Sequence, residues 1–156
     1  MRLVLFLALP LYVLDQITKF LVLANIPTHV TIEVIPGFFN LVQVHNTGAA
    51  FGMMKDNNAF FIGLASVALV AVAVMGRRGC FLDTPSRIGA ALLASGIVGN
   101  LTDRLLHGYV VDFLDVILPW YGHWPAFNVA DSCICIAAVL LFLGGLKEDA
   151  AKKIEA

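Results

Sequence analysis

Residues 59–75 read AFFIGLASVALVAVAVM, and this stretch decides the class of fold. It contains no charged residue, and it is close to the length that a helix needs to cross about 30 Å of hydrocarbon. Because backbone polar groups in lipid must pair within their own segment, the stretch must be helical. Other long apolar stretches share this character, and we expect membrane spans at about 3–23, 59–75, 88–106 and 128–146.

The composition of the whole chain supports this class. Of its 156 residues, 60% are hydrophobic and 13% are charged, and the mean hydropathy is +0.87. Soluble domains are about 45–50% apolar and about 25% charged. The net charge is −1 and the sequence has no basic stripe with interleaved aromatics, so we expect no nucleic-acid partner. The sequence predicts an all-α membrane protein with four transmembrane helices, forming one domain over residues 1–156.

The connections between the expected spans differ in character. Residues 25–58 contain β-branched and aromatic residues around Pro36-Gly37, which is a turn signal, and we expect a small β-like platform in this first outer loop. Residues 107–127 carry Trp120, Tyr121 and Trp124, which are typical of the membrane–water interface. We expect this third connection to act as a lid over a site.

The distribution of lysine and arginine predicts the orientation. Positive residues occur at the N-terminus, in residues 76–87 and in the C-terminal tail, whereas the first connection has only Lys55 and the third has none. The positive-inside rule then places both termini in the cytoplasm. The platform and the third connection would face the outer side of the membrane.

Ionisable residues inside the expected spans are the first functional signal, because each costs roughly 2.5–3.5 kcal/mol on insertion scales. Asp15 and Lys19 are four residues apart, so they share a helix face and can pair. The pair could be purely structural or could support a site. Asn100, Asp103 and Arg104 also share one helix face, where helix–helix contact is the alternative to a site.

Two further groups of polar residues lie at the outer ends of the spans. Asn46 stands among small residues, and its amide can bind an extended peptide, although an ordinary turn is the alternative. Asn128 can cap the fourth span, with Asp131 as an acid in its first turn. Judged alone, Asp131 is more typical of a cap partner than of a catalyst.

The expected topology places Asp112 and Asp131 at the same depth, near the outer boundary of the membrane. Two carboxyl groups a few ångströms apart cannot both ionise easily, so one keeps a proton. One can then activate water while the other acts as an acid, which predicts an aspartyl protease. A transporter or channel with a proton relay is an alternative, and so is a non-catalytic scaffold. Asp115 leaves open which acid pairs with Asp131.

The cysteines and histidines give no sign of a metal site. Cys80, Cys133 and Cys135 form no C-x-x-C motif, and Cys133 and Cys135 lie in an apolar run, so we interpret these thiols as packing residues. The histidines lack the spacing of metalloprotease ligands. We therefore expect no metal and no cofactor.

Five motifs, in order, resemble the bacterial lipoprotein signal peptidases (signal peptidase II). They are Asp15-Gln16-x-x-Lys19, Asn46-x-Gly48-Ala49-Ala50-Phe51-Gly52, Gly99-Asn100-x-x-Asp103-Arg104, Val110-Val111-Asp112-Phe113 and Phe127-Asn128-x-Ala130-Asp131. One such motif alone would be weak, whereas five in register across most of the chain make a specific match.

The resemblance implies a multi-pass peptidase of the bacterial cytoplasmic (inner) membrane, with its active site toward the outer face. It implies cleavage of diacylglyceryl-modified prolipoproteins just N-terminal to the lipidated cysteine, by Asp112 and Asp131. The substrate-binding residues that it implies are Asn46, Gly48, Asn100, Arg104 and Asn128, with Asp15 and Lys19 nearby. It further implies contact with membrane lipids and sensitivity to globomycin-type inhibitors. We expect a monomer.

Overall fold

The computed structural model describes residues 2–48 and 56–155, with side chains for 6–48 and 56–145. Residues 49–52 of the second motif and Lys55 lie outside the described residues. The elements, in chain order, are α1 (Arg2–Asn25), β1 (Ile32–Ile35), β2 (Phe39–Asn46), α2 (Asn58–Arg77), α3 (Thr84–His107), β3 (Val110–Leu118), β4 (Gly122–His123) and α4 (Val129–Glu155). Each helix covers one of the four predicted stretches, to within one residue at the start of α4.

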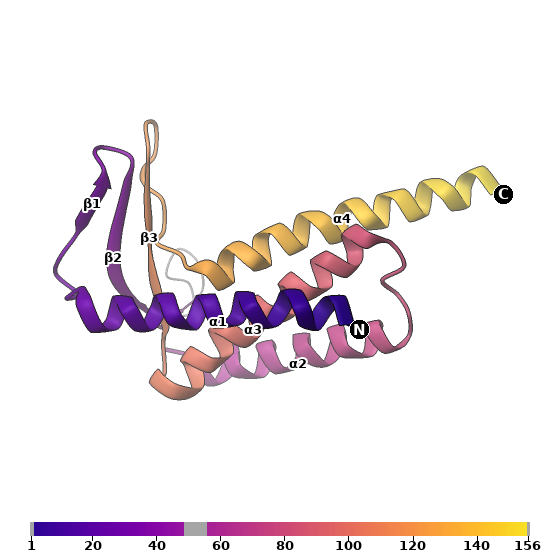
Figure 1. Cartoon of the computed structure of the whole chain (residues 1–156), viewed down its shortest axis with the longest axis horizontal. Coiled ribbons are helices and arrows are strands. Elements are labelled where there is room, and N and C mark those ends of the chain that lie inside the picture. Colours follow the sequence, from indigo (N-terminus) through magenta and orange to yellow (C-terminus); the bar gives the residue numbers. More distant parts are fainter. Residues whose placement is uncertain (1, 49–55, 156) are drawn as a thin grey trace.

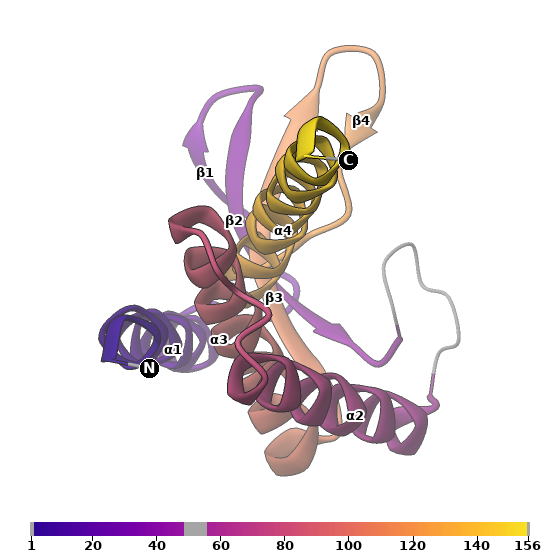
Figure 2. The same cartoon turned by 90° about the vertical axis from the view of Figure 1, so that its right-hand side faces the viewer.

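Helix α3 is the centre of the helical part. It packs against α1, α2 and α4, which surround it when the molecule is viewed end-on (Figure 2). The sheet stands across one end of the helices, while the start of α1 and the end of α4 lie at the other end (Figure 1). The connection between α2 and α3 is also at that other end. The described parts of both outer loops of the predicted topology therefore lie on one side of the bundle, together with the sheet.

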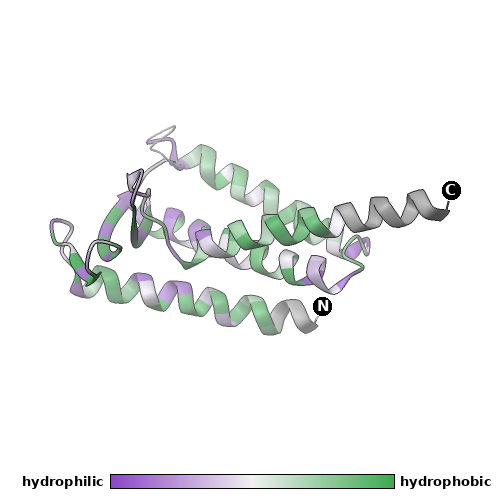
Figure 3. Cartoon of the chain, turned by 90° about the horizontal axis from the view of Figure 1, so that it is seen from above, coloured by the Kyte–Doolittle hydropathy of each residue, from purple (hydrophilic) through white to green (hydrophobic). Residues whose placement is uncertain are grey.

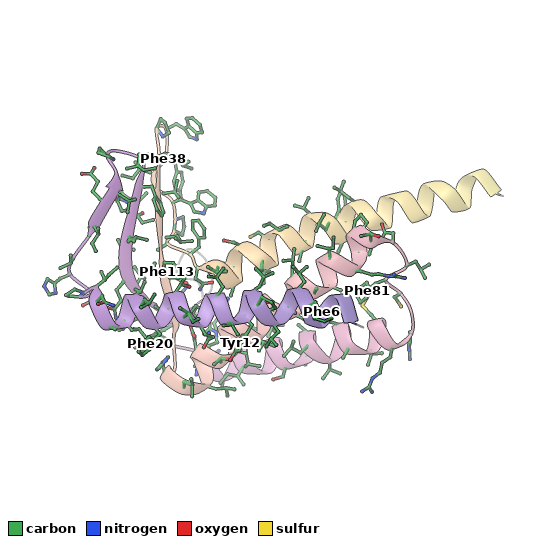
Figure 4. The ribbon with its side chains drawn as sticks, in the orientation of Figure 1. Phe6, Tyr12, Phe20, Phe38, Phe81 and Phe113 are labelled. Carbon is green, nitrogen blue, oxygen red and sulfur yellow. The ribbon has the colours of Figure 1, made fainter. Side chains whose placement is uncertain are left out.

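The helices consist mainly of hydrophobic residues (Figure 3), and many of their large hydrophobic side chains are exposed. Phe6 and Phe20 on α1 are 78% and 69% exposed and project away from the bundle (Figure 4), and α2 has no buried residue. Such extensive exposed apolar surface suits lipid rather than water. Two helical stretches are long and apolar enough to cross a membrane by themselves, Phe6–Asn25 and Asn58–Arg77, and Val129–Gly145 is a shorter apolar helix. The four-span topology remains a prediction.

The sheet has four antiparallel strands in the order β1-β2-β3-β4. The expected platform in residues 25–58 is confirmed by β1 and β2. The chain is nevertheless not all-α outside that loop, because residues 110–118 of the third connection form β3, which pairs with β2 between Val110 and Val116. The prediction of a lid is wrong for these residues. Their β-branched and aromatic side chains are typical of a strand, and they pack on α1 through Phe113 (Figure 4).

Two glycines set the geometry where α3 meets its neighbours. Gly108 ends α3 in the left-handed conformation with φ 81°, where its N–H donates to the Arg104 carbonyl, and the chain turns directly into β3. At Gly99, a Cβ atom would lie 2.6 Å from Asp15 Oδ2 and 3.1 Å from the Ala130 side chain. The absence of a side chain therefore lets α1, α3 and the start of α4 approach closely at the end of the bundle that carries the sheet.

Candidate active site

Asp112 lies in the first half of β3, immediately after the turn from α3. It pairs with Val44 of β2 in the sheet register, and it is 1% exposed. Its two carboxylate oxygens accept hydrogen bonds from neutral amides: Asn46 Nδ2 donates to Oδ2 at 2.9 Å, and Asn128 Nδ2 donates to Oδ1 at 2.7 Å. The carboxylate is thus fixed from both sides, and none of the cationic side chains that the structure describes forms an ion pair with it.

Asp131 lies in the first turn of α4, where it forms a reciprocal cap with Asn128. The Asn128 N–H donates to Asp131 Oδ2 at 3.2 Å, and the Asp131 N–H donates to Asn128 Oδ1 at 2.8 Å. This is the geometry of a capping box. The cap interpretation of these two residues is therefore confirmed. The other oxygen, Oδ1, accepts from Asn100 Nδ2 of α3 at 2.7 Å, which leaves Asp131 in contact with two elements.

Asn128 joins the two carboxylates. Its side chain donates to Asp112, and its backbone N–H and side-chain oxygen engage Asp131. Asn128 is fully buried, and no buried side-chain polar atom in the described part of the chain lacks a hydrogen bond. The structure thus brings together two acids that are far apart in the sequence, as the expected topology requires.

The electrostatics of Asp112 differ from those of an ordinary carboxylate. Burial, together with the nearby charge of Asp131, raises the pKa of Asp112 from 3.8 to about 7, and the amide donors of Asn46 and Asn128 only partly oppose this rise. Desolvation and a like charge both disfavour a second negative charge in the same site. At neutral pH the pair can therefore hold one proton between its two carboxyl groups.

Gly48 and Arg104 form a second contact beside Asn46. The Gly48 N–H donates to Asn46 Oδ1 at 3.0 Å, which orients the amide that faces Asp112. The Arg104 guanidinium donates to the Gly48 carbonyl at 2.7 Å and lies 4.2 Å from the centre of the Phe61 ring. Asn58 of α2 bonds both the guanidinium and the carbonyl of Arg104. Arg104 therefore ties the end of β2 to α2 and supports Asn46.

Asp15 and Lys19 lie behind this centre in a buried ion group. Lys19 Nζ is 2.9 Å from Asp15 Oδ2, which confirms the predicted pairing, and also 2.9 Å from Asp103 Oδ2. It donates to Asn100 Oδ1 at 3.1 Å, so it reaches Asp131 only through that amide. Sequence reasoning did not assign a role to Asp103 or to Gln16, which bonds both acids. Both residues lie inside the five motifs quoted above, and this position was the sequence signal that could have indicated a role for them.

Asp115 belongs to a separate cluster on the same strand. It is buried, and it accepts from Asn40 Nδ2 at 2.8 Å and lies 2.9 Å from His123 Nδ1. Asn40 is its register partner on β2. Asn128 links Asp131 to Asp112, whereas the hydrogen bonds of Asp115 run to β2 and β4. The geometry therefore favours Asp112 as the partner of Asp131.

A cavity of about 260 Å³ lies between α1, the end of α3 and β3. It is lined by Gln16, Lys19, Phe20, Leu23, Asp103, Leu106, His107 and Val111. Neither Asp112 nor Asp131 is among these residues, so the cavity borders the ion group rather than the acid pair. Within the part of the chain that the structure describes, no cluster of three or more histidine, cysteine or acidic side chains could hold a metal ion.

Comparison with known proteins gives a consistent result. Residues 7–147 match the family model described as signal peptidase (SPase) II. The chain is 43% identical to the lipoprotein signal peptidase of Symbiobacterium thermophilum over 88% of this chain and 90% of that protein. It is also 43% identical to the lipoprotein signal peptidase of Vibrio cholerae, over 92% and 86% of the two chains.

Solved structures agree with the sequence comparison. A bacterial membrane enzyme superposes on 97% of this chain and 92% of its own, with a TM-score of 0.91 and 30% identity. A second bacterial membrane enzyme has a TM-score of 0.85 and 31% identity, and it covers 94% of each chain. The family model covers most of the chain, and the relatives match it over nearly their whole length. The chain therefore belongs to the signal peptidase II family.

Proposed function

We propose that this protein is an aspartic endopeptidase of the bacterial inner membrane that removes signal peptides from diacylglyceryl-modified prolipoproteins, with Asp112 and Asp131 as its catalytic pair. One observation carries the assignment of the pair: two buried acids from different elements are joined through one asparagine, Asn128. Neither acid forms an ion pair among the described residues, in which the ion pairs are those of Lys19 and His123. The carboxyl groups thus stay available for proton transfer.

The chemistry follows from one shared proton. The ionised carboxylate takes a proton from a water molecule, and the water oxygen attacks the carbonyl carbon of the peptide bond before the lipidated cysteine. The protonated carboxyl donates to the carbonyl oxygen, which stabilises the charge that develops there. Collapse of the tetrahedral intermediate breaks the C–N bond, and the leaving amine takes a proton from the carboxyl group. We assign neither acid a fixed role, because the two titrate as a unit.

The polar residues around the pair are proposed to bind the peptide backbone of the substrate. Asn46 and Gly48 lie at the end of β2, and Asn100 and Asn128 face the acids from α3 and the start of α4. An extended peptide beside β2 would place its scissile bond between these amides. Arg104 would act by holding Gly48 in position.

The proposed membrane topology has four spans within a single domain, both termini in the cytoplasm and the sheet at the outer face. Helix α3 has 24 residues, so it reaches about 36 Å at 1.5 Å per residue, which is long enough to cross the hydrocarbon. Its polar residues face α1, α4 and the sheet, which explains why α3 alone does not read as a lipid-facing span. Residues at this depth suit a substrate that is itself anchored in the outer leaflet by its diacylglyceryl group.

The experiment that tests this function compares two versions of one precursor. Purified protein in detergent or lipid should cut the diacylglyceryl-modified precursor and leave the unlipidated precursor intact, with mass spectrometry locating the new N-terminus at the lipidated cysteine. Cleavage should persist in EDTA. Equal cleavage of both precursors, or loss of activity that zinc restores, would contradict the proposal.

Inhibition and assembly complete the proposed function. A globomycin-type cyclic peptide should compete with the precursor, because it would occupy the same polar surface beside Asp112 and Asp131. We propose that the monomer is the active unit, since both acids and every amide that bonds them belong to one chain. Size measurement of the active protein in detergent, with the micelle subtracted, would test the assembly.

A further inference from the structure

The buried ion group behind the acid pair contains one cation between two acids. Lys19 is 2% exposed, and its ammonium nitrogen lies 2.9 Å from both Asp15 Oδ2 and Asp103 Oδ2. A third acceptor, Asn100 Oδ1, is at 3.1 Å. An ammonium group has three N–H donors and no acceptor. All three donors of Lys19 thus have an acceptor inside the protein, which leaves none for a substrate.

The two acids of this group each hold a backbone N–H next to the proposed catalytic residues. Asp15 Oδ1 accepts from the Ala130 N–H at 2.8 Å, and Ala130 directly precedes Asp131. Asp103 Oδ2 accepts from the Val111 N–H at 3.0 Å, and Val111 directly precedes Asp112. Since the peptide bond is planar, an anchored N–H fixes the Cα of its own residue, to which the next residue is joined. Each catalytic acid is therefore preceded by an anchored peptide group.

We propose that Lys19 is a positioning residue. It binds Asp15 and Asp103 at once, and it thereby fixes the separation between the backbone segments that carry Asp131 and Asp112. This inference rests on the proposed function of the acid pair. It gives Asp15 and Lys19 a different role from the substrate binding that family resemblance implies. The third contact of Lys19 is to the Asn100 side chain, which in turn donates to Asp131, so it adds an indirect restraint on that carboxylate.

Geometry explains why lysine rather than arginine occupies this position. The three acceptors surround a single nitrogen atom at 2.9–3.1 Å, which suits a compact ammonium. A guanidinium is a planar fork whose donors diverge, so the two cations are not interchangeable at such a site. Lys19→Arg would keep the charge while it changes the distance between Asp15 and Asp103.

The kinetic test uses Lys19→Arg and Lys19→Met, with Thr18→Val as the matched control on the same turn. Among the described residues, the Thr18 hydroxyl bonds the Leu14 and Asp15 carbonyls of its own helix. We expect kcat on the lipidated precursor to fall about 100-fold in both Lys19 variants, as a displacement of about 1 Å would cause. KM should stay within about threefold of the wild-type value, and Thr18→Val should match wild type.

A pH profile separates the charge of Lys19 from its geometry. The positive charge of Lys19 lowers the pKa of Asp112, so Lys19→Met should move the alkaline fall of activity to higher pH. Lys19→Arg should leave that fall where it is while kcat stays low. If Lys19 only stabilised the fold, the pH profile of activity would not shift in Lys19→Met while it stayed unchanged in Lys19→Arg.

Hydrogen–deuterium exchange tests the same bridge without relying on activity. In Lys19→Met, peptides that contain Val111 or Ala130 should exchange faster, and peptides from α2 should keep the wild-type rate. If Lys19→Met fails to fold, Lys19→Arg, which keeps the charge, supplies the same measurement. Wild-type kcat and unchanged exchange in the folded Lys19 variants would overturn the positioning role. Failure of the wild-type protein to cut the lipidated precursor would overturn the proposed function. The exchange rates would still show whether Lys19 holds the segments that contain Ala130 and Val111 in place.

Discussion

Strand β3 carries two buried acids in different chemical settings. Asp112 and Asp115 are three residues apart and are 1% and 6% exposed. The described side chains that hydrogen-bond Asp112 are neutral amides, and burial together with the nearby charge of Asp131 raises the pKa of Asp112 to about 7. Asp115 is paired with the His123 imidazole and with the Asn40 amide. Both acids are therefore buried, and they differ in the side chains that they contact.

The difference shows how one strand can carry both an acid of the proposed catalytic pair and an acid in a structural contact. A carboxylate that is bound only by neutral donors and sits beside a second acid can exchange a proton near neutral pH. A carboxylate that contacts an imidazole from the neighbouring strand connects the two strands, and here His123 links β4 to β3. We therefore expect substitutions at the two acids to differ in kind, as the following experiments test.

The largest effect should come from removing either acid of the pair. Asp112→Asn and Asp131→Asn each abolish the proton transfer, so kcat should fall at least about 1000-fold, within the range that general acid–base groups contribute. Asp115→Asn is the matched control on the same strand, and it should retain kcat within about tenfold. The measurement is the initial rate of cleavage of a lipidated precursor by purified variants of equal monodispersity.

The same experiment can reverse the assignment. Normal cleavage by Asp112→Asn together with inactivity of folded Asp115→Asn would make Asp115 the partner of Asp131. The contact of Asn128 with both Asp112 and Asp131 would then serve only to cap the helix.

The second effect is on the pH dependence of kcat. The pKa of Asp112 lies at about 7, above its ordinary value of 3.8, so the pair keeps its shared proton up to that pH. Above it both acids are ionised and no acid remains for the leaving amine. We expect kcat to fall about tenfold per pH unit above about pH 7, and Asp115→Asn should give the same profile. A flat profile up to pH 9 would show that the pair does not act through that proton.

Sequence reasoning predicted that Asp112 and Asp131 lie close together, and Asn128, which bonds both acids, agrees with that prediction. A helix that ends and a helix that starts on one side of the bundle bring Asp112 and Asp131 together, whatever the details of the connection. The partner of Lys19 in α1 was also predictable, because a spacing of four residues is a local rule. The second partner of Lys19, Asp103, was not predictable from the sequence, because contact between α1 and α3 depends on helix packing at Gly99.

The role of Asp115 and the extent of the sheet could not be predicted for a related reason. Strand pairing joins residues that are far apart in sequence, and a shift of one residue in register moves every side chain to the other face. Asp115 faces Asn40 only because β3 pairs with β2 in the observed register, which is interrupted between Leu41 and Val44. The β-branched residues of 110–118 indicated a strand, but a connection between spans was expected to be a loop.

A third, smaller effect should follow from Asn46→Ala. The Asn46 amide stabilises the ionised form of Asp112 and so lowers its pKa. Its removal should raise the pKa of Asp112 by about one to two units, since a hydrogen bond to a charged group is worth about 1.5–3 kcal/mol. The alkaline fall of kcat should move upward by that amount. Asn40→Ala, which removes the corresponding amide from Asp115, should leave the profile in place.

The smallest effect should come from His123→Ala, which removes the imidazole partner of Asp115. His123 is largely exposed and lies in the short strand β4, so we expect a loss of less than about 1 kcal/mol, as is typical of exposed ion pairs. Thermal unfolding should show a decrease in Tm of at most about 4 °C, and His29→Ala on the exposed turn after α1 should show none. Both variants should cut the lipidated precursor at the wild-type rate. A large loss of kcat in His123→Ala would mean that the Asp115 cluster also contributes to the acid pair, and the separation of the two acids on β3 would fail.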